Sequence, residues 1–300
     1  MASGPDPNGV IQKGEEVMAI IPTGLSKTVG TANSTSVDED QLTALISAIR
    51  SQKSRLTASS VAPSGPQTTQ RSPHPEASAI VQLSANQVWT TPNGMLTGST
   101  IDSFPNWVKF YLSESNNVDN ALADAAFYYY LKNPSPDYVT VLSPATTSIT
   151  VSGTVLAQAN QSPIYHYNNA SYDVKAYFRV YSPASAPDGI SYLEADYEVG
   201  SKEAEGGIFS DDNKKLNCDV SGQSLSLPAN IEVAPDAYAL FEVILQVQYS
   251  IDNTSDIVLD FSSVGDYGFG CTGVTFDILT NNHGVAGAQP TSTKGTATRG

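Results

Sequence analysis

Histidine and cysteine are scarce in this chain of 300 residues, which holds three histidines and two cysteines. Two cysteines do not make the disulfide framework of a small secreted domain, and two distant cysteines with scattered histidines do not make a zinc site. Only His166 lies in the part of the chain with β-strand patterning, so a Ser-His-Asp site has a single candidate base. Cys218 and Cys271 are interpreted as reduced, buried thiols, with a disulfide between them as the alternative.

Short catalytic and nucleotide-binding motifs are absent as well. The sequence has no Gly-x-Ser-x-Gly elbow, no phosphate-binding loop and no dinucleotide fingerprint. A glycosidase needs two carboxylates across a cleft, and Glu194, Asp196 and Glu198 alternate on one predicted strand without a feature that selects a pair. We therefore expect a protein that is not an enzyme.

Basic residues are also few, because 15 Lys and Arg stand against 30 Asp and Glu, for a net charge of −15. This excess argues against a simple nucleic-acid-binding domain. The excess lies in residues 86–282, since residues 1–85 carry seven acidic and six basic residues. No apolar run approaches the roughly 20 residues of a membrane span, and Met1 is not followed by a signal-peptide pattern. The sequence predicts no membrane contact and synthesis in a cytoplasm.

Residues 1–79 have the composition of a flexible arm and linker that contain one amphipathic helix. Residues 56–79 are rich in Ser, Thr and Pro, which is typical of a linker. Ser36 and Glu39 have the spacing of a helix capping box. An apolar stripe at helical spacing follows: Leu42, Leu45, Ile46 and Ile49. The pattern predicts a helix over 37–54, whose stripe packs on the body of the protein or on another copy of the chain.

Four cationic residues lie at the end of this helix and in the linker, and no acidic residue lies between them. They are Arg50, Lys53, Arg55 and Arg71. We interpret them as candidate contacts to the phosphates of a genome, which would be weak and salt-sensitive. The alternative is that they complement the helix C-terminus and solvate the linker.

Residues 80–280 carry the periodicity of an all-β domain, because apolar residues recur at every second position in several runs. Turn-forming residues separate the runs. Strands are predicted at 80–83, 86–90, 107–112, 138–142, 147–158, 172–181, 191–199, 223–227, 238–250, 256–261 and 273–279. So many short strands predict a sandwich or a barrel, followed by a flexible tail at 281–300.

The longest predicted strand, 238–250, has two unlike faces. One face is apolar throughout, and the other mixes Leu240 and Ile244 with Glu242 and two glutamines. The mixed face is too apolar for a strand that faces water. We predict a central strand whose second face is partly covered by a loop, a helix or a neighbouring subunit. Leu240 and Ile244 therefore join Leu42, Leu45, Ile46 and Ile49 as candidate subunit-interface residues.

Three smaller features complete the sequence pattern. An Ala-rich segment predicts a short helix inserted at 118–128. Acidic residues cluster at 252–266 and 203–212, where calcium is the one candidate cofactor and solvated carboxylates are the default. Aromatic residues are candidates for a sugar-stacking platform, although core packing is their commoner use. These are Trp89, Trp107, Tyr128, Tyr129, Tyr130, Tyr165 and Tyr167.

The order of these elements resembles the coat proteins of small non-enveloped icosahedral viruses, RNA viruses in particular. The resemblance treats 1–79 as an internal arm and 80–280 as a shell domain, and it rests on element order, strand count, the inserted helix and Tyr-, Ser-, Thr- and Asn-rich loops. It implies an antiparallel jelly-roll β-sandwich and a capsid subunit that self-assembles into an icosahedral virion. Its partners would be copies of itself and viral RNA held by the arm.

The arm departs from this family because it is nearly neutral, whereas many such coats carry a dense Arg- and Lys-rich arm. Two other functions therefore stay open. One is a β-sandwich adhesin or carbohydrate-binding module, and the other is a glycan-degrading enzyme.

Overall fold

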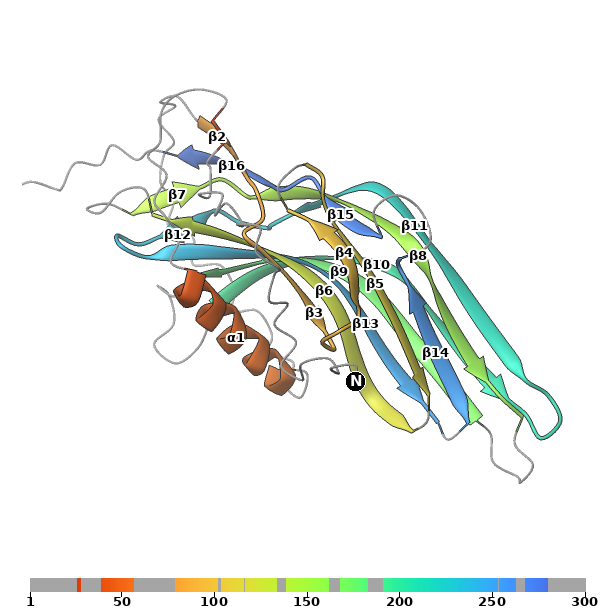
Figure 1. The fold of residues 1–300 in the computed structure, drawn as a ribbon. Helices are drawn as coiled ribbons and strands as arrows, with labels where there is room; N and C mark the ends of the chain where they lie inside the picture. The colour runs from red at the N-terminus through yellow and green to blue at the C-terminus, as the bar shows by residue number, and fades with distance from the viewer. Residues whose placement is uncertain are drawn as a thin grey trace, which may run out of the picture.

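The computed structural model of the chain describes residues 26–27, 39–56, 79–101, 104–115, 117–133, 139–161, 168–182, 191–252, 254–262 and 268–279. Within these ranges there are sixteen strands and one helix, α1 (Glu39–Leu56). The strands form two sheets that face each other, and α1 lies against the outer face of one of them (Figure 1). The predicted all-β sandwich is confirmed, while its jelly-roll connectivity stays a prediction. No helix of the described residues is long and apolar enough to cross a membrane.

The larger sheet, sheet A, has eleven strands and a main path of β1–β2–β16–β8–β14–β5–β15. The strands that pair within this sheet run antiparallel to each other. Its members are β1 (Ser26–Lys27), β2 (Ala79–Leu83), β4 (Leu96–Thr100), β5 (Asn106–Ser115), β7 (Thr140–Leu142), β8 (Thr146–Ala159), β11 (Asp212–Ser226), β12 (Ile231–Val233), β14 (Ser255–Asp260), β15 (Phe269–Cys271) and β16 (Val274–Leu279).

The smaller sheet, sheet B, has five antiparallel strands in the order β10–β9–β13–β6–β3. They are β3 (Gln87–Thr91), β6 (Val118–Lys132), β9 (Asn168–Ser182), β10 (Ser191–Gly206) and β13 (Tyr238–Ile251). Strand β13 is central, since β6 pairs with one edge and β9 with the other. Sheet B therefore presents one face to sheet A and a second, outer face.

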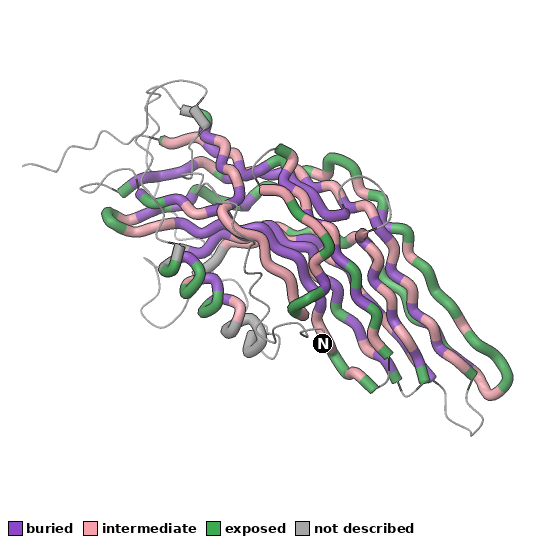
Figure 2. The backbone as a smooth tube through the Cα atoms, viewed as in Figure 1, coloured by how far each residue is buried: buried purple, intermediate pink, exposed green. Residues whose placement is uncertain are grey.

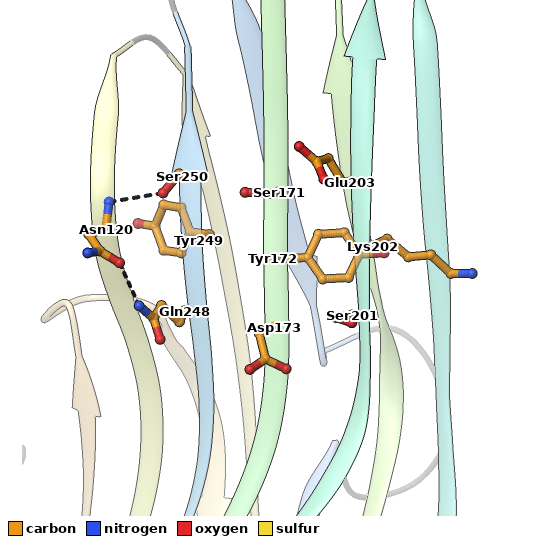
Figure 3. A pocket seen from close by; sticks show the side chains of 10 residues that line it. All are labelled: Asn120, Ser171, Tyr172, Asp173, Ser201, Lys202, Glu203, Gln248, Tyr249 and Ser250. Carbon is orange, nitrogen blue, oxygen red and sulfur yellow. Dashed lines mark hydrogen bonds between the residues drawn. The ribbon is translucent and has the colours of Figure 1, made fainter. Parts of the chain in front are cut away.

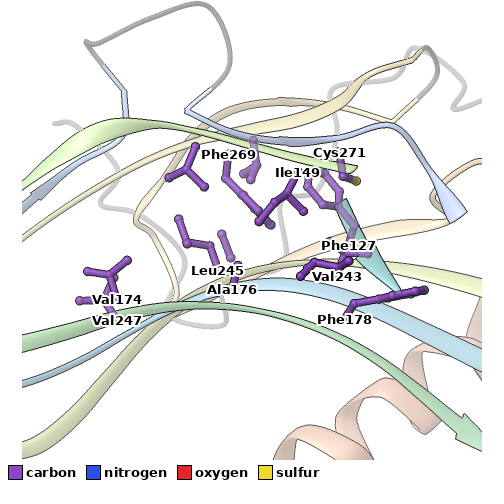
Figure 4. Close-up of a cluster of buried hydrophobic side chains, with 14 of the residues drawn as sticks. Phe127, Ile149, Val174, Ala176, Phe178, Val243, Leu245, Val247, Phe269 and Cys271 are labelled. Carbon is purple, nitrogen blue, oxygen red and sulfur yellow. The ribbon is translucent and has the colours of Figure 1, made fainter. Parts of the chain in front are cut away.

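The main hydrophobic core lies between the two sheets. Val243 and Leu245 of β13 point toward sheet A, which contributes Phe269 and Ile149 (Figure 4). Phe127 of β6 and Phe269 of β15 have ring centroids 5.6 Å apart, so an aromatic pair bridges the layers. Alternate residues of β8 are buried along its whole length, which is the period of a strand with one face in the core (Figure 2).

The outer face of β13 is covered by α1. Leu240 and Ile244 are 0 % and 1 % exposed and pack with Ile46 and Ile49 of the helix. This confirms the prediction of a central strand with a covered second face. It also identifies the cover, since α1 forms a third layer of the protein.

The helix predicted at 118–128 is wrong, because this segment is part of strand β6. Its backbone pairs with β3 on one side and with β13 on the other, where Phe127 lies opposite Val243. Ala125 faces the core and Ala126 faces α1, so small side chains let three layers approach closely. Two long-range ladders outweigh the helix propensity of a few alanines, which amounts to tenths of a kcal/mol per residue.

The strands that the sequence pattern does not predict are β1, β4, β12, β15, most of β6, the first part of β11 and the last part of β10. Strand β11 is the instructive case, because it pairs with β8 alone and many of its residues are exposed (Figure 2). An edge strand with polar side chains lacks the apolar alternation on which the prediction depended.

Both cysteines are free and buried, which confirms the interpretation of two reduced thiols. Burial raises the pKa of Cys218 to about 12 and that of Cys271 to about 11. The Cys271 Sγ lies 2.7 Å from the hydroxyl oxygen of the buried Tyr129. Both thiols therefore stay protonated near neutral pH, and neither is a nucleophile there.

Candidate functional site

An open depression of about 610 Å³ lies on sheet B and contains strands β6, β13, β9 and β10 in its floor and walls (Figure 3). Two rows of polar side chains cross it, because the strand registers align them. Gln248, Asp173 and Ser201 form one row of neighbours, and Ser250, Ser171 and Glu203 form the next. The residues between the two rows, Tyr172 and Tyr249, belong to the core cluster instead. The depression thus gathers hydroxyl, amide and carboxylate groups from strands that are distant in sequence.

Two β-bulges flank this depression. In β6 the register with β13 shifts opposite Ser250, and Asn120 takes a positive φ of 57°. In β10 the register with β9 shifts between Glu198 and Gly200, and Gly200 has a φ of 151° that suits glycine. Bulges bend a strand and re-aim its side chains, and they occur often beside functional sites.

Amide hydrogen bonds order one wall of the depression. The Gln248 side-chain Nε2 donates to Asn120 Oδ1 at 2.5 Å, and the Asn120 backbone N–H donates to Ser250 Oγ at 3.1 Å (Figure 3). The side-chain carbonyl oxygen of Gln248 is an acceptor for a ligand, and the side-chain NH₂ group of Asn120 is a donor.

Two carboxylates with fixed partners form the opposite side. Lys175 Nζ lies 2.7 Å from Asp173 Oδ2, and this hydrogen bond is the main cause of the raised pKa of Lys175. Asn169 Nδ2 donates to Glu203 Oε1 at 2.5 Å. These contacts hold both side chains in place, and the other oxygen of Asp173, Oδ1, is buried without a hydrogen-bond partner among the described residues. The described residues that line the depression supply hydroxyl, amide, ammonium and carboxylate groups, and no histidine or cysteine is among them.

The other half of this face of sheet B is occupied by α1. All six candidate subunit-interface residues meet there in one cluster: Leu42, Leu45, Ile46, Ile49, Leu240 and Ile244. The helix stripe and the strand residues bury each other within one chain. The structure therefore supports packing on the body, which was the alternative to an interface between copies.

Arg50, a candidate genome contact, forms an ion pair within the protein. Its guanidinium lies 2.5 Å from Asp124 Oδ1 of β6, donates to the Tyr128 hydroxyl at 3.2 Å and contacts Thr91. It also lies 5.8 Å from the ring centroid of Trp89. Burial alone would lower the pKa of Arg50, but Tyr128 and Asp124 outweigh it and hold the pKa above its ordinary value. These contacts argue against Arg50 as a ligand for phosphates.

The other three candidate cations cannot be placed. The backbones of Lys53 and Arg55 lie in the last turn and a half of α1, their side chains lie outside the described residues, and so does Arg71. Their contact with nucleic acid stays a prediction.

A buried carboxylate, Glu242 of β13, continues the network of Arg50. Glu242 is fully buried and accepts hydrogen bonds from the hydroxyls of Tyr128 at 2.6 Å and Tyr181 at 2.8 Å. Arg179 donates to Glu242 at 3.4 Å and also binds Glu194. Burial, and next the charge of Glu242, raises the pKa of both tyrosines well above the usual value, so both phenols stay protonated donors. Polar side chains thus tie α1 to sheet B beneath the apolar contacts.

Within the part of the chain that the structure describes, the remaining sequence-based candidates form no second site. Among the described residues, no three of His, Cys, Asp and Glu are grouped to hold a metal ion, so the carboxylates predicted for calcium are not gathered. His166, Tyr165, Tyr167 and Asp266 lie outside the described residues. Tyr128 and Tyr129 are fully buried, and Trp89 packs beside α1. Tyr128, Tyr129 and Trp89 thus contribute to packing rather than to the predicted stacking platform.

Sequence reasoning missed the depression itself. Ser171, Asp173 and Lys175 stand on the polar face of a correctly predicted strand, but polar residues on a strand usually face water alone. Only the pairing of β9 with β13 and β10, together with the two bulges, shows that these residues line a concave surface.

No protein-family model and no curated protein sequence matches this chain. The solved structures that match include that of TmCBM61 in complex with β-1,4-galactotriose. The two sequences are 10 % identical, and the aligned region covers 62 % of the present chain and 87 % of the TmCBM61 chain. The TM-score is 0.18. A TM-score this low carries no argument about function.

Proposed function

We propose that this protein binds carbohydrate through the depression on sheet B, as an adhesin or a carbohydrate-binding module, and that it does so without catalysis. The observation that supports this proposal is the pair of cross-strand rows, which place hydroxyl, amide and carboxylate groups on one open, ordered surface. Sugar hydroxyls are both donors and acceptors, so they match such a lining better than an apolar ligand would. A volume of about 610 Å³ is within the range of small-molecule sites.

The proposed binding is weak. Four hydrogen bonds at about 1 kcal/mol each give roughly 4 kcal/mol, which corresponds to a dissociation constant near 1 mM. Tighter binding in an organism would come from several copies that engage one surface together.

A glycan array followed by titration of a hit into the purified protein tests this proposal. We expect replacement of Gln248 by Leu to weaken binding at least about tenfold, because it removes an amide that both lines the depression and orients Asn120. Gln246→Leu is the matched control, since Gln246 stands on the same face of β13 outside the lining. Absence of any glycan ligand, or equal losses in both variants, would overturn the proposal.

A second candidate function, that of a viral shell subunit, is favoured by an apolar patch on sheet A. Ile80 of β2, Leu279 of β16 and Val139, one residue before β7, are 57 %, 36 % and 48 % exposed. Strand β16 pairs with both β2 and β7, so the three residues belong to one region. A contact with a neighbouring copy would bury such side chains.

The shell function predicts that the purified full chain sediments as megadalton particles, with viral RNA inside when it is expressed with a genome. Replacing Ile80 and Leu279 by Lys is expected to shift the protein to monomers with an unchanged thermal transition, because both side chains are exposed. A wild-type chain that remains monomeric at micromolar concentration would rule the shell out.

A further inference from the structure

The charges around the depression point to the class of glycan that it accepts. We infer that the depression selects glycans that carry no acidic groups and rejects sialylated or uronic acid glycans. This inference rests on the carbohydrate-binding function proposed above, and it names the substrate class of the same site.

Negative charge dominates the lining. Asp173 and Glu203 are its two carboxylates, and Lys202 is its one cation. Figure 3 shows the Lys202 side chain reaching across β10, away from Asp173 and the β13 side of the depression. A bound anion would therefore meet carboxylates without a facing ammonium group.

A second cation, beside the depression, is already paired. Lys175 stands beside the depression on β9, and its Nζ lies 2.7 Å from Asp173. Glu203 is held by a neutral amide, that of Asn169, and no cation of the described residues forms an ion pair with it. One carboxylate is thus paired with a cation and the other is not, so the groups that face the depression, with Lys202 directed away from it, have an excess of one carboxylate.

The surroundings strengthen this field. Glu198 and Asp196 are exposed on the same outer face of β10, and the whole chain has a net charge of −15. At physiological salt the screening length of about 8 Å largely screens these two carboxylates, which lie roughly 10 Å or more from Ser201 along the strand, whereas at low salt their field reaches the depression. Neutral hydroxyls avoid this repulsion and supply the protons that carboxylate oxygens accept.

The test uses an array of paired oligosaccharides on the purified full chain. The pairs are N-acetyllactosamine with and without terminal sialic acid, and galactotetraose beside tetragalacturonate. We expect binding to neutral members only, with acidic members at least about tenfold weaker at low salt, because a like charge at close range costs more than 1 kcal/mol. The difference in affinity between neutral and acidic members is expected to decrease as the salt concentration rises.

A double variant, Asp173→Asn with Glu203→Gln, is expected to weaken binding of the neutral member and to reduce the discrimination against its acidic partner at least about threefold. The matched control is Asp196→Asn with Glu198→Gln, which removes the same charge from the same face outside the lining. A thermal transition within a few degrees of wild type shows that both proteins are folded.

The outcomes separate the two proposals. Equal or tighter binding of the acidic members by the wild-type chain overturns the charge selectivity and leaves carbohydrate binding standing. Equal effects of the two double variants on discrimination also overturn it, because the selectivity would then come from the overall charge. Failure to bind any member of any pair, together with an empty general glycan array, overturns both.

Discussion

Replacement of Val243 by Asp is expected to abolish folding, whereas replacement of its neighbour Ile244 by Asp leaves a folded sandwich with a loosened α1. The two residues lie on opposite faces of the central strand β13. Val243 is fully buried between the sheets, where a carboxylate would have no partner and no route to water. An uncompensated charge there costs several kcal/mol or more, which is comparable with the whole stability of a typical domain of about 5–15 kcal/mol.

Ile244 differs from Val243 because it lies beneath α1, on the outer face of sheet B. It is 1 % exposed beneath α1, and its neighbours there include Ile46 and Leu240. An aspartate at this position can reach water if the helix moves away, so the loss is limited to the docking of α1, on the order of 3 kcal/mol. Sheet-to-sheet packing, which lies on the other face, stays intact.

Circular dichroism and limited proteolysis distinguish these results. The Val243→Asp chain should show no cooperative thermal transition. The Ile244→Asp chain should keep its β-sheet spectrum but be cleaved rapidly within α1. Gln248→Asp is the control, because Gln248 is exposed on the same face as Ile244 and beyond the helix. Simultaneous loss of sheet and helix in Ile244→Asp would show that α1 and the sandwich unfold as one unit.

The contrast between these two neighbours also shows how far sequence reasoning reaches. Alternation along 238–250 identifies which residues share a face, and the mixed second face predicts that something covers it. The capping box and the stripe at Leu42 and Ile49 locate α1 within two residues of its observed bounds. These signals are local, because periodicity and capping depend on residues a few positions apart.

The features that sequence reasoning missed are non-local. Strand β6 has a helix-like composition, and it is a strand because β3 and β13 lie on either side of it. The depression depends on the registers of four strands and on two bulges. The sequence offers Arg50 as a candidate phosphate contact, because its actual partner, Asp124, is 74 residues away. Such pairings follow from the folded topology rather than from spacing.

The pair formed by Arg50 and Asp124 leads to the second large effect. The two side chains are 13 % and 6 % exposed, and they join α1 to β6. Arg50→Met leaves Asp124 buried without its cation and is expected to cost α1 about 3–5 kcal/mol of docking free energy. Asp124→Leu leaves the guanidinium of Arg50 buried without its carboxylate in the same way. Hydrogen exchange of the α1 amides measures the loss directly, since undocking opens the helix before the sandwich.

The double variant, Arg50→Met with Asp124→Leu, should recover most of this loss, because an apolar pair of similar size often replaces a buried ion pair at little cost. The resulting coupling energy is the test, since it isolates the pair from the other contacts of Arg50 with Tyr128 and Thr91. Lys214→Met provides the comparison, because its pair with Asp212 is 46 % and 30 % exposed and a solvent-screened surface pair contributes little to stability. Single losses that simply add would mean that the ion pair itself does not fix α1, and that the other contacts of each residue account for its loss. A large coupling instead means that the buried ion pair fixes the position of α1 on sheet B, and thereby leaves the polar half of that face open to a ligand.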